Sequence, residues 1–303
     1  MSDQIPNLLV KCVSTDGRIR GVAVRASELI EGAARLHRLD PEGTCRFGEA
    51  LIAAMIVASY CKRGEQVNLR IQGSGRFHDA FVDASPEGSV RGYLVRRRNP
   101  GRGAPEGADQ GPWGEGVLSV LRAKEGEGEQ PYIGNVPLVT GHLAKDLTYY
   151  WFQSEQVPTA VGIAVRCDDG GRVLLAGGFM VQTLGGAGDE AAREIERNIR
   201  EISSLAEALA QDQDPTVLLS RVFQDMAFMI VENRQVRYEC RCSRERVLRA
   251  LSLVGVDELR EMMANKEEAV VRCDFCEKEY RVWDSELKTL ISRAAARGDG
   301  AGD

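Results

Sequence analysis

The spacing of apolar residues predicts a first region that mixes helices and strands. Between residues 26 and 40, apolar side chains recur every three or four positions, which is typical of one buried helix face. After a predicted turn at residues 40–43, a nearly unbroken apolar run continues to Cys61 and predicts a second helix inside a core. Residues 66–73 instead alternate apolar and polar positions, which is the period of a half-buried strand.

The pattern up to residue 184 predicts mostly antiparallel strands together with one more helix. We expect strands over 77–84, 89–97 and 116–123, a helix over 142–156, and a closing hairpin of 160–167 with 172–184. The stretch 96–116 is rich in glycine and proline, which predicts a long mobile loop. We therefore expect a first domain over residues 1–184 with a mixed α/β fold.

From residue 189 onward the pattern changes to that of helices. Apolar residues recur at helical spacing, with arginine and glutamate on the other face, at Ile195, Ile199, Ile202, Leu205 and Leu209. A second helix is predicted to begin at Asp214-Pro215, an N-cap followed by proline, and to continue through residue 231. Because no strand pattern is present between 189 and 232, we expect a helical linker over 185–232.

The second linker helix is unusually apolar, which leaves two interpretations open. It either packs on the main domain or forms a surface that opens to bind apolar partners, because methionine-rich faces adapt to many shapes. In the second interpretation, the candidate client-binding residues are Phe223, Met226, Phe228 and Met229.

Length and charge narrow the class of protein. A chain of 303 residues favours one large domain with one or two smaller ones. The net charge of −6 argues against a nucleic-acid backbone as the main partner, because binding phosphates needs a surplus of lysine and arginine. The N-terminus carries no secretory signal pattern, and no apolar run is long enough to span a bilayer. We therefore expect a cytoplasmic protein that binds neither nucleic acid nor membranes.

Four of the eight cysteines fall near the C-terminus as two close pairs, Cys240 with Cys242 and Cys273 with Cys276. In a reducing compartment such a cluster is typical of a metal or redox site. Four thiolates bind Zn²⁺ tetrahedrally, and a helical connector over 243–264 can bring the pairs together, so the spacing predicts one zinc ion per chain. Each pair is also close enough along the chain to form a local disulfide after slight bending.

Basic residues surround the two cysteine pairs, at Arg237, Arg241, Arg244, Arg246, Arg272, Lys278 and Arg281. Their charge either favours the reactive thiolate form or balances the negative charge of a zinc tetrathiolate, and the sequence leaves both interpretations open. The other four cysteines stand singly in the first domain, and we expect each of them to be buried: Cys12, Cys45, Cys61 and Cys167.

Several motifs together resemble one known family. They are ECRCSRERVLRAL and RCDFCEKEY near the C-terminus, with SEQVPTAV, DLTYYWFQ, YIGNVPLVTG and VRGY upstream. The chain resembles, over nearly its whole length, the redox-regulated heat-shock chaperones of about thirty-three kilodaltons, which are ATP-independent holdases. The resemblance implies an α+β fold with a zinc-binding redox-switch domain over 233–294 after the linker, followed by a disordered tail over 295–303.

The resemblance also implies a mechanism. The four paired cysteines would be the ligands of zinc in a reduced, inactive form. Oxidation would form two disulfides, release zinc, and unfold the switch and the linker. The exposed surface would then bind unfolded or oxidatively damaged proteins, and the oxidised chain would form a homodimer. One departure from the family lies at residues 73–79, where Arg76 and Phe77 replace the proline and leucine of a GxGPLG-like turn.

Two alternatives come from other functional classes. The first is a zinc-ribbon module tethered to a nucleotide- or RNA-modifying enzyme, which needs a basic face and a catalytic constellation that the sequence does not present. The second is a thiol oxidoreductase that uses Cys273 and Cys276. Its CxxC motif is expected to begin a helix after a strand, whereas here it lies between two strand-like segments. We therefore expect a binding protein rather than an enzyme.

Overall fold

The computed structural model describes residues 6–96, 111–124, 130–185, 189–265 and 268–298. The chain divides into two compact units, Met1–Glu239 and Cys240–Asp303. Most of the loop predicted over 96–116 lies outside the described residues. Within the described parts of the chain, no helix combines the length and the apolar character needed to cross a bilayer.

Five antiparallel strands form the first sheet of the first unit, in the order β10-β1-β2-β9-β8. The strands are β1 (Leu8–Ser14), β2 (Ile19–Arg25), β8 (Thr159–Cys167), β9 (Val173–Thr183) and β10 (Phe228–Gln235). Strands β8 and β9 form the predicted hairpin. The sequence pattern did not predict β1 or β2, because β2 is buried on both faces and lacks the alternation of a half-buried strand.

Six strands form the second sheet, in the order β11-β5-β4-β3-β6-β7. They are β3 (Glu65–Gly73), β4 (Phe77–Ala84), β5 (Ser89–Arg96), β6 (Gly116–Lys124), β7 (Tyr132–Pro137) and the short β11 (Arg237–Tyr238). Strand β11 pairs in parallel with β5, and the other neighbouring pairs are antiparallel. The predicted α+β fold with largely antiparallel sheets is confirmed.

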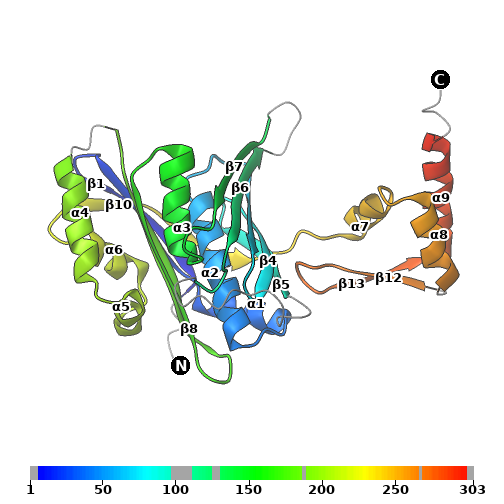
Figure 1. The fold of residues 1–303 in the computed structure, drawn as a ribbon, viewed down its shortest axis with the longest axis horizontal. Coiled ribbons are helices and arrows are strands. Elements are labelled where there is room, and N and C mark those ends of the chain that lie inside the picture. The colour runs from blue at the N-terminus through cyan, green and yellow to red at the C-terminus, as the bar shows by residue number, and fades with distance from the viewer. Residues whose placement is uncertain (1–5, 97–110, 125–129, 186–188, 266–267, 299–303) are drawn as a thin grey trace. The chain divides into compact units, whose positions relative to one another are not determined.

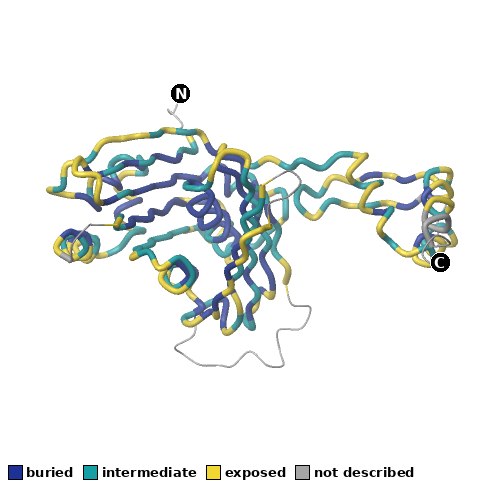
Figure 2. Tube along the Cα trace, turned by 90° about the horizontal axis from the view of Figure 1, so that it is seen from above, coloured by how far each residue is buried: buried dark blue, intermediate teal, exposed yellow. Residues whose placement is uncertain are grey.

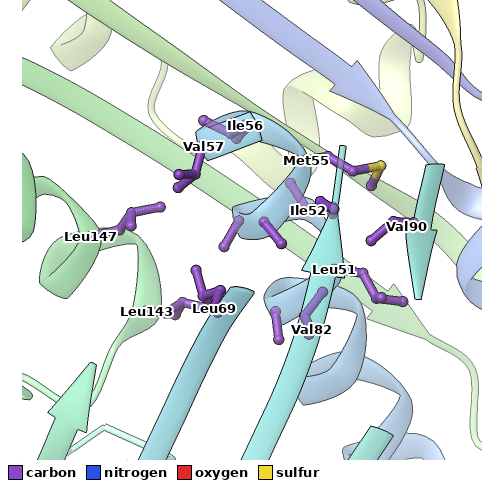
Figure 3. Packing of buried hydrophobic residues seen from close by; sticks show 14 of the residues in the cluster. Leu51, Ile52, Met55, Ile56, Val57, Leu69, Val82, Val90, Leu143 and Leu147 are labelled. Atoms are coloured by element: carbon purple, nitrogen blue, oxygen red, sulfur yellow. The ribbon is translucent and has the colours of Figure 1, made fainter. Parts of the chain in front are cut away.

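The helix α2 (Pro41–Ala58) lies between the two sheets and forms the centre of the main core (Figure 1). Its start is fixed by Asp40, whose side chain accepts a hydrogen bond from the Gly43 N–H at 2.8 Å. Figure 3 shows Leu51 and Ile52 of this helix in one cluster with side chains of the surrounding strands. Because both sheets face the helix, nearly every side of it is apolar, as the sequence predicted.

The other helices predicted in the first domain are also present. They are α1 (Ser27–Leu36) and α3 (Leu143–Tyr150), and α3 continues into a π-helical turn, η1 (Trp151–Glu155).

Three further helices cover the opposite face of the five-stranded sheet: α4 (Asp189–Glu201), α5 (Leu205–Gln211) and α6 (Pro215–Phe223). Strand β9 illustrates how both faces are used. Its residues Ala176 and Met180 belong to the core around α2, whereas Leu175 and Phe179 pack with the three covering helices. Figure 2 shows that the buried stretches of the chain concentrate in the interior of this unit. The sheet is therefore apolar on both faces, and α4–α6 complete its burial.

The helix predicted to continue through residue 231 is wrong in its second half. Helix α6 ends at Phe223, Gln224 adopts a positive φ of 41°, and the chain then enters strand β10 at Phe228. Phe228 pairs with Ser14 and Met229 with Val13 of β1. The period of a short apolar run does not distinguish a helix from a strand. Here the run forms a strand because the edge of β1 supplies partners for its backbone hydrogen bonds.

A buried asparagine joins two of the covering helices. Asn198 of α4 is 1% exposed, and its Nδ2 donates hydrogen bonds to the carbonyl oxygens of Val222 and Phe223, both at 3.2 Å. These carbonyls belong to the last turn of α6, where no intrahelical partner is left for them. Nearby, Gln224 Nε2 donates to Glu201 at 2.5 Å. The C-terminus of α6 is thereby fastened to α4.

The chain is anchored again directly before the second unit. The Tyr238 hydroxyl donates to the Gly92 carbonyl at 2.8 Å and lies 3.0 Å from the His37 ring nitrogen Nε2. On either side of it, the backbone N–H groups of Arg237 and Glu239 donate to carbonyls of the β5 region, both at 2.9 Å. This short stretch, β11, links the covering helices and β10 to the first of the paired cysteines.

The second unit is small. It contains α7 (Arg244–Leu251), α8 (Val256–Asn265), a hairpin of β12 (Glu268–Arg272) with β13 (Glu279–Trp283), and α9 (Asp284–Gly298). The predicted connector and hairpin context are both present. Helix α9 extends into the predicted tail, whose last residues lie outside the described ranges. The buried apolar side chains of this unit are Leu251, Leu259, Ala269, Val282, Leu287 and Leu290.

We predict that Asn198→Ala loosens the cover formed by α4–α6. The substitution removes the Asn198 donor from both carbonyls, although Phe223 keeps the Met226 N–H at 2.8 Å. Losing the buried hydrogen bond to the Val222 carbonyl costs about 1–3 kcal/mol of stability. The urea midpoint of the reduced protein should fall accordingly. Arg197→Ala is the matched control, because Arg197 lies next to Asn198 but its side chain is 62% exposed. Equal midpoints for the two variants would contradict the fastening role of Asn198.

Candidate metal centre

The four paired cysteines converge on one point of the second unit. All four Sγ atoms lie within 4.8 Å of one another. The Sγ atoms of Cys240 and Cys273 are 3.7 Å apart, and those of Cys242 and Cys276 are 3.3 Å apart. Four sulfurs at about 2.3 Å from a tetrahedral zinc ion are roughly 3.8 Å from one another. The cysteines are therefore positioned to bind a metal ion of this kind.

The turn between β12 and β13 presents two of these sulfurs. The carbonyl of Cys273 accepts backbone hydrogen bonds from Cys276 at 3.3 Å and from Glu277 at 2.8 Å. Glu277 has a φ of 60°, in the left-handed region, and the Cys273 N–H donates to Lys278 at 3.0 Å. This tight turn places both side chains of the CxxC motif together. The motif lies in a hairpin, as the sequence predicted, and not at the start of a helix.

The other two sulfurs come from the extended segment between β11 and α7. Ser243 ends this segment and caps α7, because its side chain accepts a hydrogen bond from the Arg246 N–H. Arg244 then joins α7 to the rest of the unit. Its guanidinium forms a bidentate pair with Glu286 of α9 at 3.2 and 2.5 Å, and it donates to the Arg281 carbonyl at 2.9 Å.

A tyrosine supports one sulfur directly. The Tyr280 hydroxyl of β13 donates a hydrogen bond to Cys242 Sγ at 3.0 Å. Burial raises the pKa of the Cys242 thiol, but the hydrogen bonds from Tyr280 and from the neighbouring thiols outweigh it and lower this pKa to about 7. Burial and the hydrogen bonds of the other cysteines raise the pKa of Cys276. Four thiolates so close together repel one another, and a divalent cation removes that repulsion.

Part of the predicted basic surroundings is engaged elsewhere. Arg237 pairs with Glu239 at 2.8 Å, Arg244 pairs with Glu286, and Arg272 pairs with Glu277. These three guanidinium groups therefore have carboxylate partners. Neither predicted role of the basic residues is decided by these pairs.

The candidate client-binding residues occupy different environments. Phe223 is fully buried in α6, and Met226 and Phe228 are half-buried against the same apolar cluster. Met229 is 52% exposed, because its side chain leaves the opposite face of β10. The structure thus brings the first three together under α4–α6 and separates the fourth from them. A role in client binding stays a prediction for all four.

The expectation of burial holds for one of the four single cysteines. Cys12 is 1% exposed, whereas Cys45, Cys61 and Cys167 are half-buried. The expectation was wrong for these three because Cys45 lies near the start of α2, Cys61 lies three residues after its end, and Cys167 ends β8, where the core meets solvent.

Comparison with known proteins places the chain in a family. A family model described as Hsp33 protein matches residues 7–283, which includes the four converging cysteines. The chain belongs to the Hsp33 family. The 33 kDa chaperonin of Limosilactobacillus fermentum is 35% identical over 291 residues, which cover 94% of this chain and 98% of that protein. The 33 kDa chaperonin of Shouchella clausii is 31% identical over 95% of this chain and 98% of its own length.

A solved structure is similar as well. The crystal structure of the 33 kDa chaperonin, or heat shock protein 33 homolog, from Thermotoga maritima matches with a TM-score of 0.83 and 31% identity. It covers 96% of this chain and all of the other. Membership in the Hsp33 family supports a chaperone function for this chain, and the fold agrees with that of the family. The relatives are named as chaperonins, which agrees with the expectation of a chaperone.

We predict that the reduced protein binds one zinc ion per chain and that Cys240→Ser or Cys273→Ser weakens this binding. Each substitution removes one corner of the tetrahedron, so the loss should exceed the roughly 10–100-fold effect of changing an outer-shell partner. Competition with a chromogenic chelator measures the affinity. Cys61→Ser, which removes a half-buried thiol of the first unit, serves as the control. Unchanged affinity in the two ligand variants would remove these cysteines from the site.

Proposed function

We propose that this Hsp33 family chain is a redox-regulated, ATP-independent holdase that binds unfolded or oxidatively damaged proteins. The observation that carries the proposal is the convergence of four cysteine sulfurs within 4.8 Å in a unit whose apolar core is small. The thiols are both the ligands of the metal and the groups that an oxidant attacks. Their oxidation state therefore controls the fold of the second unit.

The donor set fits Zn²⁺. Cys240, Cys242, Cys273 and Cys276 supply only sulfur, which is a usual structural zinc set, and their spacing matches tetrahedral geometry. These four thiolates would hold the ion, and the bound ion would supply a link between the segment before α7 and the β12–β13 turn. A unit of this size depends on such a link for its stability. In the reduced form the link is intact, and we infer that this form is inactive.

Oxidation removes the ligands by joining them. We infer that Cys240 pairs with Cys242 and Cys273 with Cys276; each pair gives up two electrons and two protons to the oxidant and gains one S–S bond. Pairing across the site, Cys240 with Cys273 or Cys242 with Cys276, is also within reach of the side chains. The local pairing is favoured as the switch because it lets the two segments separate. Cross-pairing would keep them joined.

The client surface follows from the cover on the five-stranded sheet. Helices α4–α6 bury an apolar face of that sheet, and they continue through β10 and β11 directly into the first cysteine. We infer that unfolding of the second unit loosens this cover. Phe223, Met226 and Phe228 then become available to clients, together with the sheet face beneath them. Met229 is exposed already, so it contributes to binding without being switched.

The setting follows from the same features. Four thiols that must stay reduced at rest point to a reducing compartment, so we infer that the protein works in the cytoplasm. A newly exposed apolar face also favours self-association, and we infer that the oxidised chain forms a homodimer.

The central test compares reduced and oxidised protein in one assay. Light scattering of a thermally unfolding client enzyme measures holdase activity, and a zinc-sensitive dye follows zinc release in the same samples. The oxidised protein should suppress scattering without ATP, and the reduced protein should not. Equal suppression by both forms, or suppression that precedes zinc release, would refute the redox switch.

A second prediction concerns the cover itself. Phe223→Ser removes a fully buried ring that packs on the sheet, at a cost of about 3–5 kcal/mol. Met226→Ser removes a half-buried thioether side chain from the same cluster. Both variants should bind an apolar dye and a client while zinc is still bound. Met229→Ser is the matched control: because Met229 is already exposed, this variant should not switch on dye or client binding while zinc is bound.

Hydrogen exchange of the unchanged protein provides the complementary measurement. Residues 189–239 should lose protection on oxidation. Equal protection in both redox states, with client binding still switched on, would place the client site elsewhere.

A further inference from the structure

A second pair of thiols lies inside the first unit. The Sγ atoms of Cys45 and Cys167 are 3.4 Å apart, although 122 positions separate them in the sequence, and both residues are half-buried. Among the described residues, no third cysteine, histidine or carboxylate completes a metal site with them; the one such group is the four-cysteine cluster. The chemistry open to an isolated pair of thiols in contact is disulfide formation.

Two elements of the core bring this pair together. Cys45 lies near the start of α2, and Cys167 is the last residue of β8. One helical turn further on, Gly48 approaches Val165 of the same strand so closely that a Cβ at Gly48 would lie 3.2 Å from Val165 Cγ2. The helix and the strand therefore touch at two successive points: Gly48 lies three residues after Cys45 on the helix, and Val165 lies two residues before Cys167 on the strand. These steps keep to one helix face and one sheet face.

Local features fix the two ends. A register shift marks the end of the β8–β9 ladder: Arg166 pairs with Leu175 and Cys167 with Val173, so the extra residue lies in β9 and Cys167 stays on the same face as Val165. The side-chain Oδ1 of the next residue, Asp168, accepts hydrogen bonds from the Gly170 N–H at 3.0 Å and the Arg172 N–H at 2.9 Å, which holds the turn in place. The start of α2 is held by its cap, Asp40. Closing the sulfurs from 3.4 Å to about 2.05 Å then needs small side-chain rotations.

We propose that Cys45 and Cys167 form an intramolecular disulfide when the protein meets a peroxide, which makes this pair a second redox site. One thiolate sulfur attacks the O–O bond of the peroxide and becomes a sulfenic acid, releasing hydroxide or the corresponding alkoxide. The second sulfur attacks the sulfenic sulfur, the S–S bond forms, and water leaves. With hydrogen peroxide, two thiols and one oxidant molecule give one disulfide and two water molecules.

The surroundings order the two steps. Burial raises the pKa of the Cys167 thiol to about 12, and the adjacent Cys45 thiol and Asp168 carboxylate act in the same direction. Because Cys167 is held protonated, the first attack on peroxide falls to Cys45. Cys167 then resolves the sulfenic acid.

The bond would brace the first unit. It closes a loop that contains the five strands β3–β7 and α3, so it restricts the unfolded chain far more than a local disulfide does. It also ties α2 to β8, the edge strand of the sheet whose other face α4–α6 cover. If the proposed function holds, the oxidant that unfolds the second unit would at the same time secure the sheet that receives the client.

Peptide mapping of the full-length protein tests the proposal. Reduced protein is treated with a series of hydrogen peroxide concentrations, its remaining thiols are alkylated under denaturing conditions, and the digest is analysed by mass spectrometry. A peptide that joins Cys45 to Cys167 and lacks two hydrogen atoms is expected, while Cys12 and Cys61 remain alkylated. Recovery of both Cys45 and Cys167 as free thiols, at the highest dose that leaves Cys61 unmodified, would overturn the proposal.

Single variants test the order and the bracing. In Cys167→Ser, dimedone should trap a sulfenic acid at Cys45, whereas Cys45→Ser should leave Cys167 unlabelled; the reverse labelling would overturn the assigned order. Cys61→Ser is the matched control and should still form the cross-link. The thermal transition of the first unit should be several degrees higher in oxidised unchanged protein than in oxidised Cys45→Ser, and the two should coincide after reduction. Coincident transitions in the oxidised state would overturn the bracing role.

These measurements remain informative if the holdase proposal fails. Cross-link mapping and thermal unfolding do not use a client, so a missing cross-link and a missing holdase activity are separate results.

Discussion

The structure depends on a sheet that is apolar on both faces. One face of the five-stranded sheet is buried by α2, which is itself enclosed by the second sheet. The other face is buried by α4, α5 and α6, which have 13, 7 and 9 residues. Helices this short are marginal on their own in water, so they persist because the sheet completes them. The two faces are therefore covered with different stability. Helix α2 is packed between two sheets, whereas α4–α6 pack against one sheet face only.

The second unit has too little buried apolar area to be stable through its core alone. Its buried cluster draws on two short helices, a hairpin and α9, and a core of that size contributes little net stability. The cross-link supplied by four cysteines would replace the missing core. Polar contacts such as the Arg244–Glu286 pair orient the elements but are exposed to solvent, where ion pairs contribute little. A unit held in this way is suited to respond to the state of its ligands.

The sequence predicted those features whose information is local. Helix α2, strand β3 and the β8–β9 hairpin follow from hydrophobic period, and the metal centre follows from two cysteine spacings. Strand β2 is buried on both faces and shows no alternation, and β10 is an apolar run that reads equally well as helix. The contact of Cys45 with Cys167 and the hydrogen bond from Tyr280 to Cys242 join distant positions, so only the folded chain reveals them.

Tyr238 limits how far a disturbance in the second unit can spread. Its hydroxyl, together with backbone hydrogen bonds on either side, fastens the chain to β5 two residues before Cys240. Unfolding that begins at the cysteines must break these hydrogen bonds to β5 before it reaches β10 and the helices α4–α6. If the proposed switch holds, unfolding of the second unit and release of the apolar face would therefore be two separable events with separate thresholds. A chain in which only the second unit has unfolded would not yet bind clients. It would be able to refold that unit without having exposed the apolar face of the sheet.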